Sequence, residues 1–526
     1  MKVIAVAMVT TMVCAELRQV LVVSRHGVRG PYGPEGLPPT EANMQRYSKD
    51  KYPFPVKATD WGTSDDATEL VSPKITKHGA RVIRNMGEYF AKHLYPSYMA
   101  AAAVTTSPAS AVCADAFAYA DDNERDYLTA QEFLHGFLPH CSELSPVING
   151  TRLLFEQGQD PTATCPVASQ AMYQGIVGGP TTDNVARQYA VEISSLNSLL
   201  GCCEPVVCGL RNATDQCDLF HVPSAWTGKF YEPWQDSLSE AQFLSEWFLL
   251  QSLNNMSLPP AMTLADVVSL GVIHKVHMDL ITNEFNSENF GSTLLVHLVA
   301  SMQQTIQQAS PVSVKSGNKS GNHHDDDDDQ GPHLLQSLSN KFLFYAGHDI
   351  NLLFLKNLLR LEWETENWLS NQPNPGSMLV FELHTEQPHS TSEVDFYVQA
   401  YFVAASPSQI RHAETLSPHN PPDRVEVTIP HCSQDVVLPN GTAAVRCTFT
   451  DFKQAAGLAI RQQCVSPTLA KYAATLLTPP RPSASWTFKI VVVTVLSVAL
   501  LGVVWKYIAR FNQAKSPEYT KYTALT

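Results

Sequence analysis

The feature that most constrains this chain is an apolar run, Val20–Val23, that leads directly into the charged segment Arg25-His26-Gly27-Val28-Arg29-Gly30-Pro31. A short continuous run of branched apolar residues predicts a buried strand. Gly27 permits a close approach of the backbone, and Pro31 ends the segment. The sequence therefore predicts a core strand whose end carries a histidine between two arginines.

These residue types point to anion chemistry. Guanidinium groups bind phosphate oxygens bidentately and stay charged at any relevant pH, so Arg25 and Arg29 predict a phosphate site with His26 as a nucleophile inside it. A lone histidine after a strand is more often structural, and a short motif is a hypothesis until its context confirms it. A second segment of the sequence with matching chemistry is needed to support a catalytic role for His26.

A second apolar strand, Phe342–Gly347, ends in His348 and Asp349. In open α/β sheets, ligand-binding residues gather beyond the carboxyl ends of the strands. We therefore expect His26 to meet His348 and Asp349 in one crevice, with a phosphate ester as the substrate.

The two segments resemble the RHGxRxP motif and the late His-Asp pair of the histidine acid phosphatases, a branch of the histidine phosphatase superfamily. The stretch Glu124–Gly136 is similar to the family segment that supplies another phosphate-binding arginine, here Arg125. Ile75–Gly79 and Gly376–Leu383 are similar to a family helix start and a late core strand, and all these motifs occur in the family's order.

Two alignments compete around Arg125. In the first, Tyr119 stands where the family usually has an arginine. In the second, Val104–Ser107 is the strand and Ala111 stands where the arginine belongs, which would put activity in doubt. The flanking residues favour Arg125, since the family pattern is also matched by Ala130, Phe133, Leu134 and Gly136.

The resemblance implies an α/β fold: a mixed-sheet sandwich catalytic domain with an inserted α-helical cap domain. It implies that His26 attacks phosphorus to form a phosphohistidine and that Asp349 protonates the leaving oxygen. It assigns the phosphate oxygens to Arg25, Arg29, Arg125 and His348. A protonated Asp349 needs low pH or a raised pKa, which predicts an acid optimum. The chemistry requires no cofactor and no metal.

Two alternatives stay open. One is a phytase-like phosphatase of narrow specificity on the same fold. The other is a catalytically weak endocytic cargo protein or receptor that kept the scaffold. The complete set of site residues favours an enzyme, because a decayed site should have lost at least one of Arg25, His26, Arg29, His348 and Asp349.

The amino terminus predicts export. Residues 1–15 have a basic start, a short apolar centre and small residues at the end, as in a signal peptide cleaved after Ala15. Ten cysteines then remain, an even number that predicts disulfides rather than zinc ligands, with pairings that the sequence leaves open. Five glycosylation sequons fit the same compartment, at Asn149, Asn212, Asn255, Asn318 and Asn440.

The carboxyl terminus predicts a membrane anchor. Ile490–Trp505 carries no charge, so we expect one transmembrane helix over residues 486–508, preceded by a stalk over 465–485. Basic residues follow it, which places the tail, 509–526, in the cytosol and makes this a single-pass type I membrane protein. In the tail, Tyr522 and Leu525 resemble the YxxΦ signal bound by cytosolic clathrin adaptors. We expect the protein at the cell surface and in endosomal or lysosomal membranes.

The chain between these ends divides into three predicted parts. The catalytic α/β domain comprises residues 16–141 and 336–464, and the helical cap comprises 142–335 with an acidic low-complexity loop at 316–333. Ser237 to Glu240 reads as a capping box, and Thr263 to Asp266 opens another helix. With 36 basic and 50 acidic residues the net charge is −14, so the chain is a poor nucleic-acid binder. A homodimer is left open.

Overall fold

The structure is a computed structural model that describes residues 16–49, 52–70, 73–96, 113–148, 153–154, 165–212, 215–309, 334–386, 395–430, 432–437 and 443–476. The signal peptide, the membrane helix, the sorting signal and the acidic loop were all predicted for residues outside these ranges. Within the described part of the chain, no helix is both long and apolar enough to cross a bilayer.

A nine-stranded mixed sheet forms the centre of the described chain, in the order β10-β11-β8-β7-β1-β6-β2-β3, with β9 paired to β8. The pairings among β1, β6, β2 and β3 are parallel, and the others are antiparallel. The strands are β1 (Glu16–Arg25), β2 (Ala116–Ala120), β3 (Val147–Ile148), β6 (Phe342–Gly347), β7 (Met378–Glu386), β8 (Asp395–Ala404), β9 (Asp423–Val427), β10 (Gln434–Val437) and β11 (Ala443–Thr448). The predicted mixed α/β fold is confirmed.

Strand β6 is buried throughout, and its alternate side chains show why helices cover both faces of the sheet. On one face, Phe344 and Phe342 stack on Phe133 and Phe137 of α6, with ring centroids 4.1 and 4.2 Å apart. On the other face, the Tyr345 hydroxyl lies 3.1 Å from a ring nitrogen of a histidine in α12. Side chains on both faces of the sheet at β6 are therefore buried under helices.

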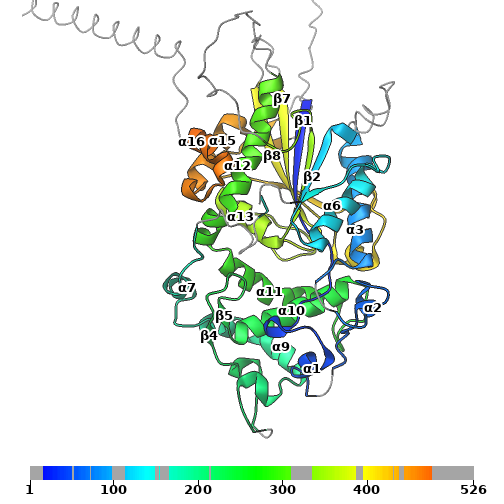
Figure 1. Cartoon of the computed structure of the whole chain (residues 1–526), viewed down its shortest axis with the longest axis vertical. Helices are drawn as coiled ribbons and strands as arrows, with labels where there is room; N and C mark the ends of the chain where they lie inside the picture. Colours follow the sequence, from blue (N-terminus) through cyan, green and yellow to red (C-terminus); the bar gives the residue numbers. More distant parts are fainter. Residues whose placement is uncertain are drawn as a thin grey trace, which may run out of the picture. The chain divides into compact units, whose positions relative to one another are not determined.

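Figure 1 shows these two helical layers, with α3 and α6 on one side of the sheet and α12, α15 and α16 on the other. The helices of the layers are α3 (Lys77–Tyr89), α6 (Glu124–Phe137), α12 (Glu284–Ala309), α13 (Asp349–Leu359), α15 (Phe449–Ala459) and α16 (Pro467–Leu476). The short helix α14 (Pro407–His412) instead contacts α10 (Ser237–Leu253) and α11 (Leu264–Ile281). The predicted helix start at Ile75–Gly79 is confirmed, because the Thr76 side chain caps α3.

A separate set of helices lies beyond the carboxyl ends of the parallel strands (Figure 1). It contains α7 (Gln170–Val177), α8 (Asp183–Gln188), α9 (Ala190–Leu200), α10 (Ser237–Leu253), α11 (Leu264–Ile281) and the small ribbon of β4 (Ala225–Trp226) and β5 (Trp234–Gln235). Two short helices from the first part of the chain join it, namely α1 (Glu41–Gln45) and α2 (Ala58–Trp61). Trp61 packs on Trp247 of α10 with ring centroids 5.8 Å apart.

This arrangement corrects two predicted boundaries. The segment around α1 and α2 was assigned to the catalytic sheet, yet it packs on α10 because its aromatic side chains complete that helix's core. The stalk was expected from residue 465, yet α16 buries Leu469, Ala473 and Leu476 against α12 and α15. A stalk can therefore begin only after Leu476.

Of the two predicted helix starts, one is confirmed and the other is displaced. A helix does begin at Thr263–Asp266, and in the structure these two residues form a capping box at the start of α11. At α10 the capping residue is Asp236 rather than Ser237, and its partner is Ser239. The Asp236 carboxylate accepts from the backbone amides of Leu238 and Ser239, so the helix starts one residue earlier than predicted.

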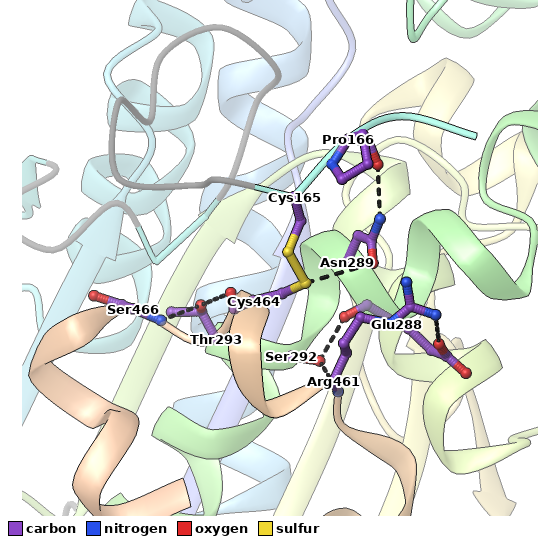
Figure 2. The surroundings of a disulfide bond; sticks show 9 residues. All are labelled: Cys165, Pro166, Glu288, Asn289, Ser292, Thr293, Arg461, Cys464 and Ser466. Carbon is purple, nitrogen blue, oxygen red and sulfur yellow. Dashed lines mark hydrogen bonds and ion pairs between the residues drawn. A yellow bond between two sulfur atoms is a disulfide. The ribbon is translucent and has the colours of Figure 1, made fainter. Parts of the chain in front are cut away.

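Five disulfides join the ten cysteines: Cys113–Cys141, Cys165–Cys464, Cys202–Cys203, Cys208–Cys217 and Cys432–Cys447. Figure 2 shows the disulfide Cys165–Cys464, which lies beside α12. It joins two cysteines that are 299 positions apart in the sequence. Next to it the Asn289 amide donates to the Pro166 carbonyl at 2.7 Å. This disulfide fixes the start of the cap segment to the end of the sheet layer.

Two of the five predicted glycosylation sites can be located. Asn212 and Asn255 are exposed, as an acceptor asparagine requires. The other three, Asn149, Asn318 and Asn440, lie outside the described residues. Glycosylation at all five positions stays a prediction.

Candidate active site

The carboxyl ends of β1 and β6 lie side by side, which brings the two sequence motifs together. Arg25 is the register partner of Gly347, and the His26 amide donates to the Gly347 carbonyl at 2.8 Å. The rings of His26 and His348 meet edge to face with centroids 5.6 Å apart. The expected crevice is thus present at the carboxyl edge of the parallel strands.

Two glycines allow the chain to turn at His26. A Cβ on Gly27 would lie 2.9 Å from a carbon of Ile83, so a larger residue would push the loop off α3. Gly376 has a φ of +77° and donates its amide to the His26 carbonyl at 2.9 Å. The Gly27 amide donates to the Thr129 hydroxyl at 3.0 Å, which ties this loop to helix α6.

The tautomer of His26 follows from its surroundings. Its Nδ1 lies 2.9 Å from the Gly27 carbonyl, which can only accept, so Nδ1 carries the proton. The lone pair is then on Nε2. Burial, together with the charges of Arg125, Arg25 and Arg29, holds the pKa of His26 well below its usual value. His26 is a neutral imidazole with a free lone pair even in mildly acidic solution.

Three buried arginines surround this histidine. Arg25 is fixed by a hydrogen bond from Nη1 to the Pro373 carbonyl at 2.9 Å. Arg29 donates from Nη1 to the Gly30 carbonyl at 3.1 Å, and its guanidinium lies over the Tyr32 ring at 4.5 Å. Arg125, on the first turn of α6, lies 3.4 Å from Nδ1 of His348 through Nη2. The alignment that selects Arg125 therefore places it among the other site residues.

His348 is flanked by two aspartates. Its Nε2 lies 2.7 Å from Asp121 Oδ2 and 3.6 Å from Asp126 Oδ2. Burial lowers the pKa of His348, but Asp126 and Asp121 oppose this and leave the pKa above its usual value. Neither aspartate was singled out from the sequence, although Asp121 directly follows β2 as His348 follows β6.

The same three side chains are the described group that comes nearest to a metal site. Donor atoms of Asp121, Asp126 and His348 lie within 4.8 Å of one another. Arg125 lies beside them, with Nε 3.8 Å from Asp126 Oδ2. Arg125 compensates one of the two carboxylate charges and a protonated His348 compensates the other, so this geometry fits the holding of a charged histidine better than the binding of a metal cation.

Asp349 lies beside Arg25 and His274. Its Oδ2 lies 2.9 Å from Arg25 Nη2 and 3.7 Å from His274 Nε2. Burial raises the pKa of Asp349, but the charge of Arg25 and the hydrogen bond with His274 outweigh it and hold the pKa well below the usual value. The sequence left open two ways of protonating Asp349, low pH or a raised pKa. The structure shows a lowered pKa, so low pH is required.

Glu246, on α10, is a site residue that the sequence reasoning missed. Its Oε1 lies 2.9 Å from Arg29 Nη2 and 3.2 Å from Arg25 Nη2. Burial raises the pKa of Glu246, but Arg29, His274 and Arg25 lower it to about 2. The only available signal was a glutamate beside the apolar residues Phe243, Leu244 and Trp247 of α10, which by itself is not specific.

The three arginines, His26, His348, Asp349, Glu246 and His274 line one cavity of about 610 Å³, whereas Asp121 and Asp126 lie behind His348 and do not line it. Its inner part is formed by Arg25, His26, Arg29, Arg125, His348 and Asp349, which we call the phosphate cradle. Its outer wall comes from residues 231–281 and the loop at 31–39. A cavity of this size holds a small organic molecule.

The chain was compared with known proteins. The model of the histidine phosphatase superfamily (branch 2) matches residues 16–174 and 230–403. A curated relative is the phytase AppA of Escherichia coli (strain K12), 25% identical over 445 residues, which are 80% of this chain and 88% of the relative.

Solved structures share the fold. The Hafnia alvei phytase in complex with tartrate has a TM-score of 0.64 at 20% identity, covering 86% of this chain and 99% of its own. The Citrobacter braakii phytase has a TM-score of 0.61 at 20% identity, covering 86% and 100%. With the family model matching more than half of its length, this chain belongs to the histidine phosphatase superfamily, branch 2.

Proposed function

We propose that this protein is an acid phosphatase that hydrolyses phosphate monoesters through a phosphohistidine intermediate. The observation that carries the proposal is the environment of His26: a neutral imidazole, with its lone pair on Nε2, enclosed by three buried arginines. Such a group can attack phosphorus while the cations hold the phosphate oxygens.

The reaction divides into two balanced steps. In the first, Nε2 of His26 forms a bond to phosphorus, the ester P–O bond breaks, and Asp349 gives a proton to the leaving oxygen. In the second, Asp349 accepts a proton from water, the water oxygen attacks phosphorus, and the N–P bond breaks. Arg25, Arg29 and Arg125 stabilise the charge on the equatorial oxygens in both transition states.

The pKa directions at the site support an acid optimum. His26 stays neutral as the pH falls because its pKa is lowered, so the nucleophile is not lost in acid. The lowered pKa of Asp349 keeps its carboxyl group ionised except in acid, so its role as the proton donor requires low pH. His348 keeps its positive charge below a raised pKa and loses it as the pH rises through that value. A neutral His26, a protonated Asp349 and a charged His348 therefore occur together only at low pH.

Two other functions remain as alternatives. The relatives named phytases make a narrow phytase-like specificity the first of these. The second is a catalytically weak endocytic receptor or cargo protein, which the assembled cradle argues against.

Hydrolysis of p-nitrophenyl phosphate by the full-length protein across pH tests the proposal. We expect turnover with an optimum below pH 7, and we expect His26→Ala to abolish it while the far-UV circular dichroism stays unchanged. A His26→Ala variant that keeps more than a few per cent of the wild-type rate would overturn the assigned role of His26.

We further propose that the enzyme is a type I membrane protein that cycles between the cell surface and endosomal or lysosomal membranes. The uncharged run Ile490–Trp505, the basic residues after it and the Tyr522 to Leu525 motif support this. Surface labelling of a Tyr522→Ala variant should show accumulation at the plasma membrane. Internalisation at the wild-type rate would exclude this signal.

A further inference from the structure

Arg25 contacts two carboxylates at once. Its Nη2 lies 2.9 Å from Asp349 Oδ2 and 3.2 Å from Glu246 Oε1. Its Nη1 donates to the Pro373 carbonyl at 2.9 Å, which helps to hold the guanidinium in place. Its Nε is buried and has no hydrogen-bond partner among the described residues. The cation that should hold phosphate is therefore already paired with Asp349, the proposed acid.

A bound phosphate must compete for this pairing. A guanidinium holds an oxyanion through two parallel N–H groups, one on Nη2 and the other on Nε or Nη1. Nη2 of Arg25 is the atom that both carboxylates contact. Arg29 is placed in the same way, since its Nη2 lies 2.9 Å from Glu246 Oε1 and its buried Nε has no hydrogen-bond partner in the described part of the chain. An anion in the phosphate cradle therefore draws positive charge away from Asp349 and Glu246.

The two carboxylates depend on Arg25 to different degrees. Burial raises the pKa of Glu246, and three basic side chains lower it to about 2, in the order Arg29, His274 and Arg25. Burial also raises the pKa of Asp349, but the charge of Arg25, followed by the hydrogen bond with His274, holds it well below its usual value. Arg25 is thus the main partner of Asp349 and only a minor partner of Glu246.

The other groups around Asp349 cannot replace Arg25. Asp349 begins α13, and His274 of α11 lies 3.7 Å from its Oδ2 through Nε2. The same Nε2 lies 3.7 Å from Glu246 Oε1, so His274 is shared between the two carboxylates. Glu246 of α10 is itself a like charge. His26, which follows β1, has a pKa held well below its usual value and stays neutral.

We infer that an anion entering the phosphate cradle causes Asp349 to take up a proton from solvent. This rests on the proposed phosphatase function, in which Asp349 later gives that proton to the leaving oxygen. The anion weakens the pairing with Arg25 and adds negative charge beside the carboxylate, and both changes favour the neutral acid. In the free enzyme Asp349 is ionised except in acid, so the proton that the first step needs arrives together with the substrate.

Binding of sulfate to the full-length protein measures this coupling without turnover. Sulfate is a tetrahedral dianion that does not itself titrate at pH 5, so any proton taken up goes to the protein. Calorimetric titration at pH 5 in buffers of different ionisation enthalpy counts the protons that accompany binding. We expect an uptake of about one proton per bound sulfate. Sulfate binding without net proton uptake would overturn the inference.

Variants of the facing groups identify the residue that takes the proton. Asp349→Asn should still bind sulfate but lose the proton uptake, and its Kd for sulfate should rise less steeply with pH than that of the wild type. Glu246→Gln and His26→Ala should both keep the uptake. Asp60→Asn is the matched control and should keep it too, because Asp60 is exposed on α2 and does not line the cavity. Uptake that persists in Asp349→Asn, or that disappears in Glu246→Gln or His26→Ala, would contradict the inference.

The same measurements keep the two proposals distinguishable. Proton-coupled sulfate binding in a protein that hydrolyses no p-nitrophenyl phosphate would support the coupling and refute the proposed function. Turnover of p-nitrophenyl phosphate combined with sulfate binding that takes up no proton would support the proposed function and refute the coupling.

Discussion

The carboxylate of Glu246 contacts the two arginines that lead the first motif: its Oε1 lies 2.9 Å from Arg29 Nη2 and 3.2 Å from Arg25 Nη2. Helix α10 thereby supplies a negative group to a site otherwise built to hold an anion. The phosphate of a substrate must share these guanidinium groups with Glu246 or displace it from them.

Replacing Glu246 by glutamine should therefore tighten phosphate binding. We expect the inhibition constant of inorganic phosphate at pH 6 to fall about fivefold, which corresponds to about 1 kcal/mol for the loss of one competing charge. With a pKa of about 2, Glu246 is ionised at that pH, so the charge is present in the wild type. Glu132→Gln is the control, since Glu132 pairs with Arg84 outside the cavity. An unchanged or larger inhibition constant in Glu246→Gln would show that Glu246 helps to hold the arginines for phosphate.

Asp126→Asn should narrow the pH profile on its alkaline side. Asp126 helps to raise the pKa of His348, and the charge of that histidine is lost as the pH rises through its pKa. Removing the aspartate lowers this pKa, so the alkaline limb of kcat/KM should move to lower pH. The other charged groups facing His348 are Asp121 and Arg125, which the substitution leaves in place.

The control for this profile is Asp122→Asn, an exposed aspartate four residues earlier in the chain. Its alkaline limb should stay at the wild-type position. If the alkaline limb of kcat/KM in Asp126→Asn stays at the wild-type pH or moves to higher pH, Asp126 does not raise the pKa of His348.

Asp349→Asn should separate substrates by their leaving group. An amide cannot protonate an alkoxide, so an alkyl ester such as glycerol 2-phosphate should slow by about 10²–10⁴-fold. p-Nitrophenyl phosphate, whose leaving group needs no proton, should slow far less. In the wild type the alkyl ester should also have the lower pH optimum, because Asp349 has a lowered pKa and is protonated only in acid. Equal losses on both substrates would remove Asp349 from the acid role.

The central part of this site could be predicted from the sequence because it depends on short-range patterns. An apolar run followed by polar residues predicts a strand, and it also predicts at which edge of the sheet those polar residues lie. His26, His348 and Asp349 follow strands of this kind, and the parallel pairing of β1 and β6 brings them together. Arg125 was found by resemblance, from the pattern around it on α6.

The rest of the site could not be predicted because it depends on how distant elements pack. Glu246 lies on α10, and only the position of that helix over the strand ends brings it to the arginines. His274 reaches Asp349 in the same way from α11. The pKa of Asp349 likewise depends on Arg25 being 2.9 Å away, which no sequence pattern specifies.

The misplaced boundaries have a similar cause. Residues around Trp61 follow the first motif in the chain, but their aromatic side chains pack on Phe243, Trp247 and Phe248 of α10. Prolines after Leu476 suggested a stalk, while Leu469 and Ala473 of α16 are held by tertiary contacts with the sheet layer.

Direct detection of the phosphorylated histidine tests the central claim. The full-length protein should be mixed with p-nitrophenyl phosphate at acid pH, quenched within milliseconds in alkaline denaturant, digested and analysed by mass spectrometry. We predict a phosphoryl group on His26 that is stable to alkali, labile to acid, and more abundant in a variant whose second step is slowed. Phosphate release at the full wild-type rate with no phosphoryl group on His26 at any quench time would contradict the account.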